Sequence, residues 1–148
     1  MAIIIRPVAP TDRQVWQGLF EAYARFYKLE LPQGAADTVW GWIFEPDPDF
    51  WCDLAADTDG NIIGLVQYQL MRRSLGGGEV CYLSDLYVEP VVRGSGAGRA
   101  LIDHVLDFAR TRGLAGVRWL TQQDNHQARK LYDTYQPRSD FILYNVPV

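Results

Sequence analysis

The sequence is poor in the features that mark disulfide frameworks, metal centres and membrane spans. Its two cysteines, Cys52 and Cys81, lie far apart and match no metal-ligand or redox spacing. No apolar stretch approaches the roughly 20 residues of a membrane span, and the apolar run at residues 3–5 is too short for a signal peptide. We therefore expect a cytoplasmic protein with reduced thiols, no bound metal and no membrane partner.

Positive charge is also scarce. The chain has 14 Lys and Arg against 18 Asp and Glu, which gives a formal net charge of −4 at pH 7. A general nucleic-acid binder would usually be basic, so we expect no nucleic-acid partner. Aromatic residues, in contrast, make up 13% of the chain, and aromatic residues fill cores and line small-molecule clefts.

The spacing of apolar residues and turn residues predicts one domain over residues 1–148 with the order β-α-α-β-β-β-α-β-α-β. Strands are expected over residues 3–5, 50–56, 62–71, 79–88, 117–121 and 141–146, and helices over about 12–26, 36–44, 96–112 and 125–135. The first helix should bury Val15, Leu19, Ala22 and Phe26. The strand-helix-strand unit around residues 96–112 should be parallel, whereas the earlier strands should be antiparallel. The prediction is an α/β fold with a mixed, mostly antiparallel central sheet and helices on both faces.

A glycine-rich loop, Arg93-Gly94-Ser95-Gly96-Ala97-Gly98, joins the strand 79–88 to the helix 96–112. Glycines leave backbone N–H groups unshielded and let a ligand approach closely. The start of a helix carries partial positive charge and binds anions. Arg93 and Arg99 add charge for further phosphate oxygens. The loop therefore predicts a phosphate-binding site.

The spacing within this loop narrows the ligand. A dinucleotide fingerprint would need a glycine where Arg99 or Leu101 stands, and a triphosphate loop would need Gly-Lys-Ser/Thr, which the sequence lacks. The pattern that remains is Arg-x-x-Gly-x-Gly, from Arg93 to Gly98. A turn without a ligand is the alternative, although such dense glycine at a helix start is costly without a reason.

At these residues the chain resembles the GNAT superfamily of N-acetyltransferases. The loop 93–98 is similar to that family's acetyl-CoA loop, residues 82–90 resemble its central strand, and residues 125–132 resemble its Asn-x-x-Ala-x-x-Leu-Tyr helix. The segment 26–32 is similar to a branch that includes fungal histone and D-amino-acid acetyltransferases. The resemblance implies the GNAT-like acyl-CoA N-acyltransferase fold and an enzyme that uses acetyl-CoA and releases CoA.

The resemblance also implies where acetyl-CoA binds. The backbones of Leu86 and Val88 would pair with the pantetheine arm, and an N–H there would stabilise the acetyl carbonyl. Asn125 would bind the pantetheine amide, and Tyr132 would protonate the departing thiolate. The full set of implied cofactor contacts is Leu86, Tyr87, Val88, Arg93, Gly94, Ser95, Gly96, Ala97, Gly98, Arg99, Asn125, Ala128 and Tyr132. The alternatives are that Asn125 only caps its helix and that Tyr132 is a core residue.

The reaction needs a base, because an ammonium group cannot attack. Asp85 is the candidate, beside the implied thioester site. Alternation along the strand predicts that Ser84 lies on the opposite face from Asp85. Relatives tend to have a Glu-Asp pair at these two positions, so Ser84 is a departure. A water chain to Asp85 or Ser84 is one alternative, and an Asp85 that only braces the strand is another.

The acceptor is less determined by the sequence. In the family the first two helices and their loop wall the amine pocket, which makes Tyr27, Glu30, Trp42 and Ser84 the predicted substrate-binding residues. Aromatic and acidic groups suit a cationic amine, and a small-molecule amine such as a polyamine or an amino acid is the preferred acceptor. A protein lysine or N-terminus and a non-catalytic acyl-CoA-binding module remain the alternatives. Family habit implies a homodimer, and the two histidines are expected at the surface.

Overall fold

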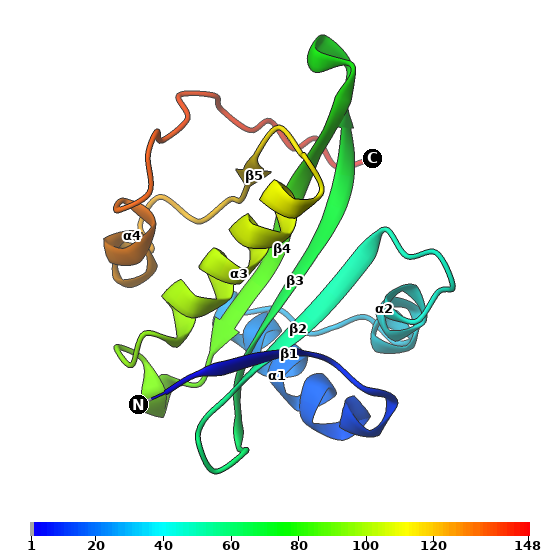
Figure 1. Ribbon diagram of the computed structural model, residues 1–148, viewed down its shortest axis with the longest axis vertical. Helices are drawn as coiled ribbons and strands as arrows, with labels where there is room; N and C mark the ends of the chain where they lie inside the picture. Colours follow the sequence, from blue (N-terminus) through cyan, green and yellow to red (C-terminus); the bar gives the residue numbers. More distant parts are fainter. Residues whose placement is uncertain (1) are drawn as a thin grey trace.

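The structure, a computed structural model that describes residues 2–148, is built around a five-stranded sheet of order β1-β2-β3-β4-β5 (Figure 1). The strands are β1 (Ile4–Pro7), β2 (Phe50–Ala56), β3 (Ile62–Arg73), β4 (Gly78–Val88) and β5 (Val117–Arg118). The helices are α1 (Arg13–Phe26), α2 (Ala35–Ile43), α3 (Ala97–Thr111) and α4 (His126–Tyr132). The pairs from β1 to β4 are antiparallel, and β4 with β5 is parallel. The predicted mixed, mostly antiparallel sheet is confirmed.

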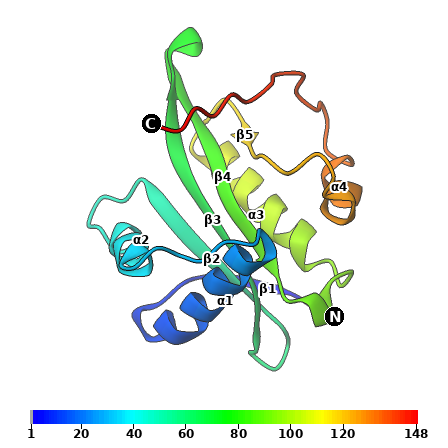
Figure 2. The ribbon, with the colours of Figure 1, turned by 180° about the vertical axis from the view of Figure 1, so that it is seen from behind.

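Helices cover both faces of this sheet. Figures 1 and 2 show α3 on one face and α1 with α2 on the other, and α4 lies beyond β5. The α1–α2 face buries the cluster Val8, Trp16, Leu19, Phe20, Val39, Phe50, Cys52, Leu54, Leu65 and Tyr87. The α3 face buries the cluster Ala55, Ile63, Val66, Tyr68, Cys81, Leu83, Ala97, Leu101, Ile102, Val105 and Ala109. None of the helices in residues 2–148 combines the length and the apolarity needed to cross a membrane.

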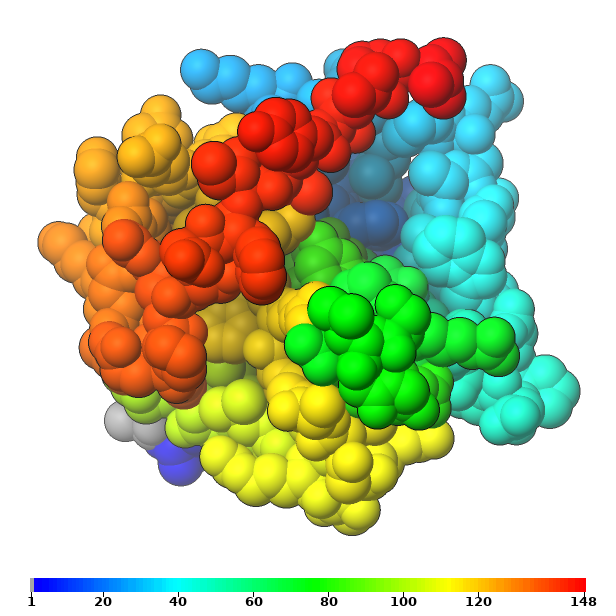
Figure 3. All heavy atoms as spheres, turned by 90° about the horizontal axis from the view of Figure 1, so that it is seen from above, coloured from blue at the N-terminus to red at the C-terminus, as the bar shows by residue number. Residues whose placement is uncertain are grey.

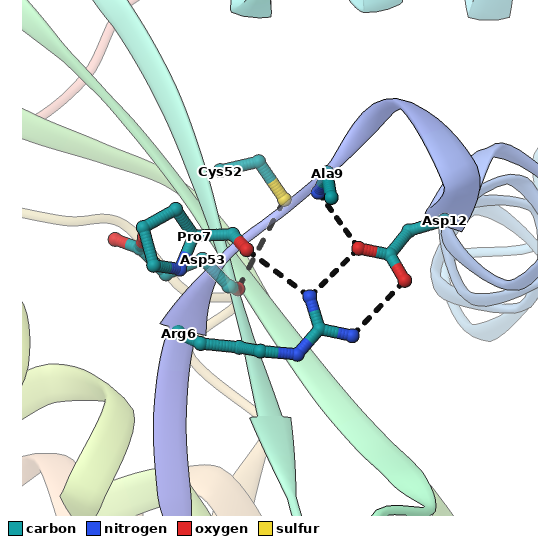
Figure 4. Close-up of polar contacts among 6 residues, drawn as sticks. All are labelled: Arg6, Pro7, Ala9, Asp12, Cys52 and Asp53. Atoms are coloured by element: carbon teal, nitrogen blue, oxygen red, sulfur yellow. Dashed lines mark hydrogen bonds and ion pairs between the residues drawn. The ribbon is translucent and has the colours of Figure 1, made fainter.

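The chain enters α1 through a fixed corner after β1. Figure 4 shows the Arg6 guanidinium spanning the Asp12 carboxylate, with nitrogen–oxygen distances of 2.7 and 3.0 Å. The same carboxylate accepts a hydrogen bond from the Ala9 N–H at 2.7 Å. The hydrogen bond from Arg6 holds the pKa of Asp12 below its ordinary value. These contacts link the end of β1 to the residue that precedes α1.

A β-bulge at Ser84 changes which side chains share a face of the sheet. At this point β3 advances by one residue while β4 advances by two, so Ser84 has no partner of its own. Asp85 accepts a hydrogen bond from Gln67 Nε2 at 2.8 Å, and Ser84 Oγ accepts one from Gln69 Nε2 at 2.9 Å. Gln67 and Gln69 alternate onto the same face of β3, where Gln67 also meets Trp16 of α1. The prediction that Ser84 and Asp85 lie on opposite faces is therefore wrong.

The C-terminal part of the chain departs most from the predicted elements. The strand expected over 117–121 is limited to Val117–Arg118, and α4 ends at Tyr132 rather than near residue 135. The strand expected over 141–146 does not form, and its large apolar side chains are exposed. An alternating apolar pattern makes a strand only where a free sheet edge accepts it, and β5 offers an edge of two residues.

Candidate active site

A cleft of about 370 Å³ lies between α1, the end of β4, the glycine loop and α4. Its wall contains most of the predicted cofactor residues: Leu86, Tyr87, Val88, Arg93, Gly94, Gly96, Ala97, Gly98, Arg99, Asn125, Ala128 and Tyr132. The wall also contains the predicted acceptor residue Tyr27. Segments that are far apart in the sequence therefore meet at one site.

The loop side of the cleft is the N-terminus of α3. Gly94 and Gly96 have φ angles of 86° and 94°, which residues with a side chain rarely adopt. Gly96 is the N-cap of the 15-residue α3, and its carbonyl accepts the first helical hydrogen bond, from the Ala100 N–H at 3.0 Å. The N–H groups of the first turn have no partner within the helix. They add to the positive end of the helix dipole and can bind an anion.

Two arginines flank this loop. The Arg93 guanidinium lies over the rings of Phe26 and Tyr87, at 5.5 and 5.7 Å from their centroids. Arg99 Nη2 donates a hydrogen bond to Thr134 Oγ1 at 2.9 Å. Within residues 2–148 neither arginine forms an ion pair, so both charges can interact with phosphate oxygens.

Ser95 does not line the cleft, but its hydroxyl lies in the same loop, directly before the N-cap of α3. Its Oγ is buried and has no hydrogen-bond partner among the described residues. A buried hydroxyl without a partner costs roughly 1–3 kcal/mol. A phosphate oxygen bound at the start of α3 is a suitable acceptor for it. The orphan hydroxyl and the free N–H groups together fit the pyrophosphate of acetyl-CoA.

The sheet opens beside this loop. β4 and β5 pair only at Cys81–Val117 and Tyr82–Arg118 within the described chain. From Leu83 to Val88, β4 continues without β5, so this edge has no partner strand among residues 2–148, although the Val88 carbonyl oxygen accepts a hydrogen bond from Arg93 Nε at 3.1 Å. An unpaired strand edge offers N–H and C=O groups to an extended ligand. The gap is suited to the pantetheine arm that the resemblance assigns to Leu86 and Val88.

α4 carries two of the predicted functional residues. Asn125 takes the N-cap position, yet its side chain makes no capping bond, and Nδ2 donates instead to Thr121 Oγ1 at 3.0 Å. Tyr132 packs edge-on against Trp119, with ring centroids 5.8 Å apart. Burial raises the pKa of Tyr132 to about 12. Its hydroxyl therefore stays protonated at neutral pH, as a proton donor requires.

Asp85 does not line the cleft itself. It is partly buried beneath α1, and burial raises the pKa of its carboxyl. Tyr23 of α1 is near this carboxyl and also lines the cleft: its hydroxyl donates a hydrogen bond to the Ser84 carbonyl oxygen at 3.4 Å. The hydrogen bond from Gln67, and to a smaller extent Tyr23, lowers the pKa of Asp85 against the effect of burial.

Sequence reasoning missed Tyr23 because it identified the core face of α1 only in part. Of the four predicted core residues, Leu19 is buried and Ala22 packs against the core, but Val15 is 37% and Phe26 is 47% exposed. The buried residues of α1 are Trp16, Leu19, Phe20 and Ala24. The spacing from Trp16 through Phe20 to Tyr23 follows the same helical period. A face rich in large aromatics was the signal that could have found it.

The remaining predicted acceptor residues do not meet at the cleft. Trp42 of α2 is 44% exposed and packs against Phe50, with ring centroids 5.5 Å apart. Glu30 lines a separate hollow between α1 and the loop that follows it. Ser84 lies beneath α1 with Gln69. Five further lining residues were not among the predicted site residues: Tyr23, Phe26, Val92, Gln127 and Leu131.

Residues 16–135 match the acetyltransferase (GNAT) family, and the chain belongs to this family. It is 34% identical over 143 residues to the D-amino-acid N-acetyltransferase HPA3 of Saccharomyces cerevisiae, a match that covers 96% of this chain and 89% of that protein. A crystal structure of a probable acetyltransferase shares the fold, with a TM-score of 0.83 at 23% identity over 100% of this chain and 98% of that one. The same fold occurs in AAC(6')-Iy, bound to a bisubstrate analogue of CoA, with a TM-score of 0.80 at 20% identity over 100% of both chains. The protein is an acetyl-CoA-dependent N-acetyltransferase.

Proposed function

We propose that one domain, residues 1–148, transfers the acetyl group of acetyl-CoA directly to the primary amine of a small molecule, such as a polyamine or an amino acid. The observation that carries the proposal is that Tyr132, with its protonated hydroxyl, shares one cleft with the helix N-terminus and with an aromatic wall from α1. Aromatic faces attract cationic amines. The D-amino-acid acetyltransferase activity in the name of the yeast relative supports a small acceptor.

Different residues would bind acetyl-CoA and transfer the protons. Bound acetyl-CoA supplies an activated acetyl thioester. The loop from Arg93 to Arg99 would hold its pyrophosphate, and the unpaired edge of β4 with Asn125 would orient its arm. Tyr132 Oη would give its proton to the departing sulfur, and Asp85 would receive the proton of the attacking amine. The amine attacks directly, so no side chain of the enzyme is acetylated.

A homodimer in the cytoplasm is part of the proposal. Large apolar side chains along the C-terminal segment are exposed, among them Phe141 at 91% and Tyr144 at 84%. Figure 3 shows this segment, in red, lying on the outer surface. Exposed apolar patches of this kind mark interaction sites, and sedimentation should give the mass of two chains. Cys52 and Cys81 are free thiols, which suits a reducing compartment.

The test of the activity is release of free CoA thiol in the presence of acetyl-CoA and a panel of polyamines, amino acids and peptides. We expect turnover with small primary amines. Turnover with peptides alone would show that the acceptor is a protein lysine or N-terminus and not a small molecule. Binding of CoA without turnover on any amine would identify a non-catalytic acyl-CoA-binding module instead.

The role of Tyr132 is tested by Tyr132→Phe, which keeps the ring against Trp119 and removes the hydroxyl. We expect kcat to fall about 100-fold, because general acid catalysis is typically worth this much or more. The dissociation constant of acetyl-CoA, measured by calorimetry, should stay nearly unchanged. An unaltered kcat would remove Tyr132 from this role.

A further inference from the structure

A line of polar contacts runs from the core to the cleft on the α1 face of the sheet. Trp16 Nε1 donates to Gln67 Oε1 at 2.8 Å, and Gln67 Nε2 donates to Asp85 Oδ2 at 2.8 Å. An indole nitrogen can only donate, so the Gln67 amide oxygen must face Trp16 and its NH₂ must face Asp85. Gln67 is fully buried. The Asp85 carboxylate is therefore held in place from the core side.

On the other side of Asp85 stands Tyr23. Its hydroxyl donates a hydrogen bond to the Ser84 carbonyl oxygen at 3.4 Å, beside Asp85, whose charge helps to raise the pKa of Tyr23 after the larger effect of burial. Its ring packs edge-on against Tyr27 with centroids 5.2 Å apart, and Tyr23 shares the wall of the cleft with Tyr132. Asp85 is not part of that wall. Of the described titratable groups near Asp85, which are Tyr23, Cys52 and Tyr82, Tyr23 is the one that lines the cleft.

No cationic side chain of the described residues pairs with Asp85. Among residues 2–148 its carboxylate takes part in no ion pair. The titratable groups that face it are Tyr23 from α1, Cys52 from β2 and Tyr82 from its own strand, and each of them is neutral at pH 7 in its ordinary state. Burial raises the pKa of Asp85, so this carboxylate binds a proton more readily than a surface aspartate does.

We propose that Tyr23 is a further catalytic residue, which passes the proton of the acceptor ammonium to Asp85. The N–H bond of the ammonium breaks as an O–H bond forms on Tyr23 Oη. The original O–H bond of Tyr23 breaks as an O–H bond forms on the Asp85 carboxylate. The products are a neutral amine and a neutral Asp85, Tyr23 is unchanged, nothing is oxidised, and Asp85 later releases the proton to water. The inference rests on the proposed transfer to an amine.

The test begins with Tyr23→Phe, which keeps the ring against Tyr27 and removes the relaying hydroxyl. We expect kcat to fall about tenfold at pH 7 and the solvent isotope effect to decrease. The KM for the amine and the dissociation constant of acetyl-CoA should stay within about twofold. Tyr68→Phe is the matched control, because it removes a tyrosine hydroxyl bonded to a carboxylate on the other face of the sheet. It should leave kcat per folded molecule unchanged.

A double variant tests whether Tyr23 and Asp85 act in series. If the proton passes through both groups, Tyr23→Phe combined with Asp85→Asn should be no slower than Asp85→Asn alone. Multiplying losses would show that the two residues act separately and would overturn the relay. An unchanged kcat and pH profile in Tyr23→Phe would overturn it as well.

A measurement without turnover checks the contact itself. Carbon NMR of the aspartate carboxyls, in protein free of acetyl-CoA, should show a higher pKa for Asp85 in Tyr23→Phe, because the nearby Tyr23 hydroxyl lowers it. An unchanged pKa would overturn the relay. Failure of the wild-type protein to acetylate any amine would reject the proposed function and the relay together. Wild-type activity that Tyr23→Phe fully retains would reject the relay alone.

Discussion

Each face of the sheet carries a carboxylate with a tyrosine hydroxyl near it, and the two pairs differ in whether the tyrosine lines the cleft. On the α3 face, Asp53 Oδ2 accepts a hydrogen bond from the Tyr68 hydroxyl and lies 3.1 Å from His104 Nε2. On the α1 face, Asp85 has Gln67 on one side and Tyr23 on the other. The chemical groups are nearly the same, so their difference in role must come from position.

The position of the tyrosine makes this difference. Tyr68 is 3% exposed and belongs to the core cluster beneath α3. The contacts of the Asp53–Tyr68 pair therefore connect β2, β3 and α3 within the core. Neither Asp53 nor Tyr68 lines the cleft. Tyr23 lines it. A buried tyrosine–aspartate pair stabilises the fold on one face, and the same pair becomes a candidate proton path where its hydroxyl meets a ligand site.

The largest expected effect is that of Asp85→Asn. The amide oxygen still accepts the Gln67 hydrogen bond, so the fold should hold, but the side chain can no longer take up a proton. We expect kcat to fall about 100-fold or more, measured by thiol release at saturating substrates. Circular dichroism melts serve as the control for folding. Full activity would mean that Asp85 only braces β4, and the contrast between the two pairs would disappear.

The intermediate effect is that of Asp53→Ala on the other face. It leaves the Tyr68 hydroxyl buried without its partner, and we expect the free energy of unfolding to drop by about 2 kcal/mol. Urea denaturation measures this drop. The kcat of the folded fraction should stay at the wild-type value. A large loss of kcat at unchanged stability would place Asp53 in the catalytic machinery and contradict the comparison.

The smallest effect is that of His104→Gln, and it depends on pH. The hydrogen bond to Asp53 raises the pKa of His104 above its ordinary value of 6.5. The stability that protonated His104 adds is therefore fully present below about pH 6.5 and is lost as the pH rises through the higher folded-state pKa. Because the side chain of His104 is 37% exposed, its protonation should add only about 0.5 kcal/mol to the free energy of unfolding.

The measurement for His104 is the difference in Tm between the wild type and His104→Gln at pH 5.5 and at pH 8.5. The Tm of the wild-type protein should exceed that of the variant by more at pH 5.5 than at pH 8.5. Other groups titrate alike in both proteins and cancel in the difference. A difference that is equal at both pH values, or larger at pH 8.5, would show that protonation of His104 does not stabilise the fold.

The sequence predicted those parts of the site whose residues are contiguous in the chain. The glycine loop and the Asn125–Tyr132 segment each carry their pattern within a few residues, and the cleft contains nearly all the cofactor contacts that they implied. The alternation used for β4 failed at Ser84, since a bulge adds a residue without changing the local pattern of residue types. The prediction of a strand over 141–146 was wrong because alternation of apolar residues shows that a segment suits a half-buried sheet surface. It does not show that a partner strand is available.

The sequence by itself determined the elements up to α3, the glycine loop and the class of cofactor, because these depend on local backbone preferences and on residues that are close in the chain. Only the tertiary structure decided that Ser84 and Asp85 share a face and that Tyr23 is near Asp85 and lines the cleft. Tyr23 and Ser84 are 61 positions apart, and their contact follows from how α1 packs on the sheet. Packing over such separations depends on the whole core, which no local pattern contains.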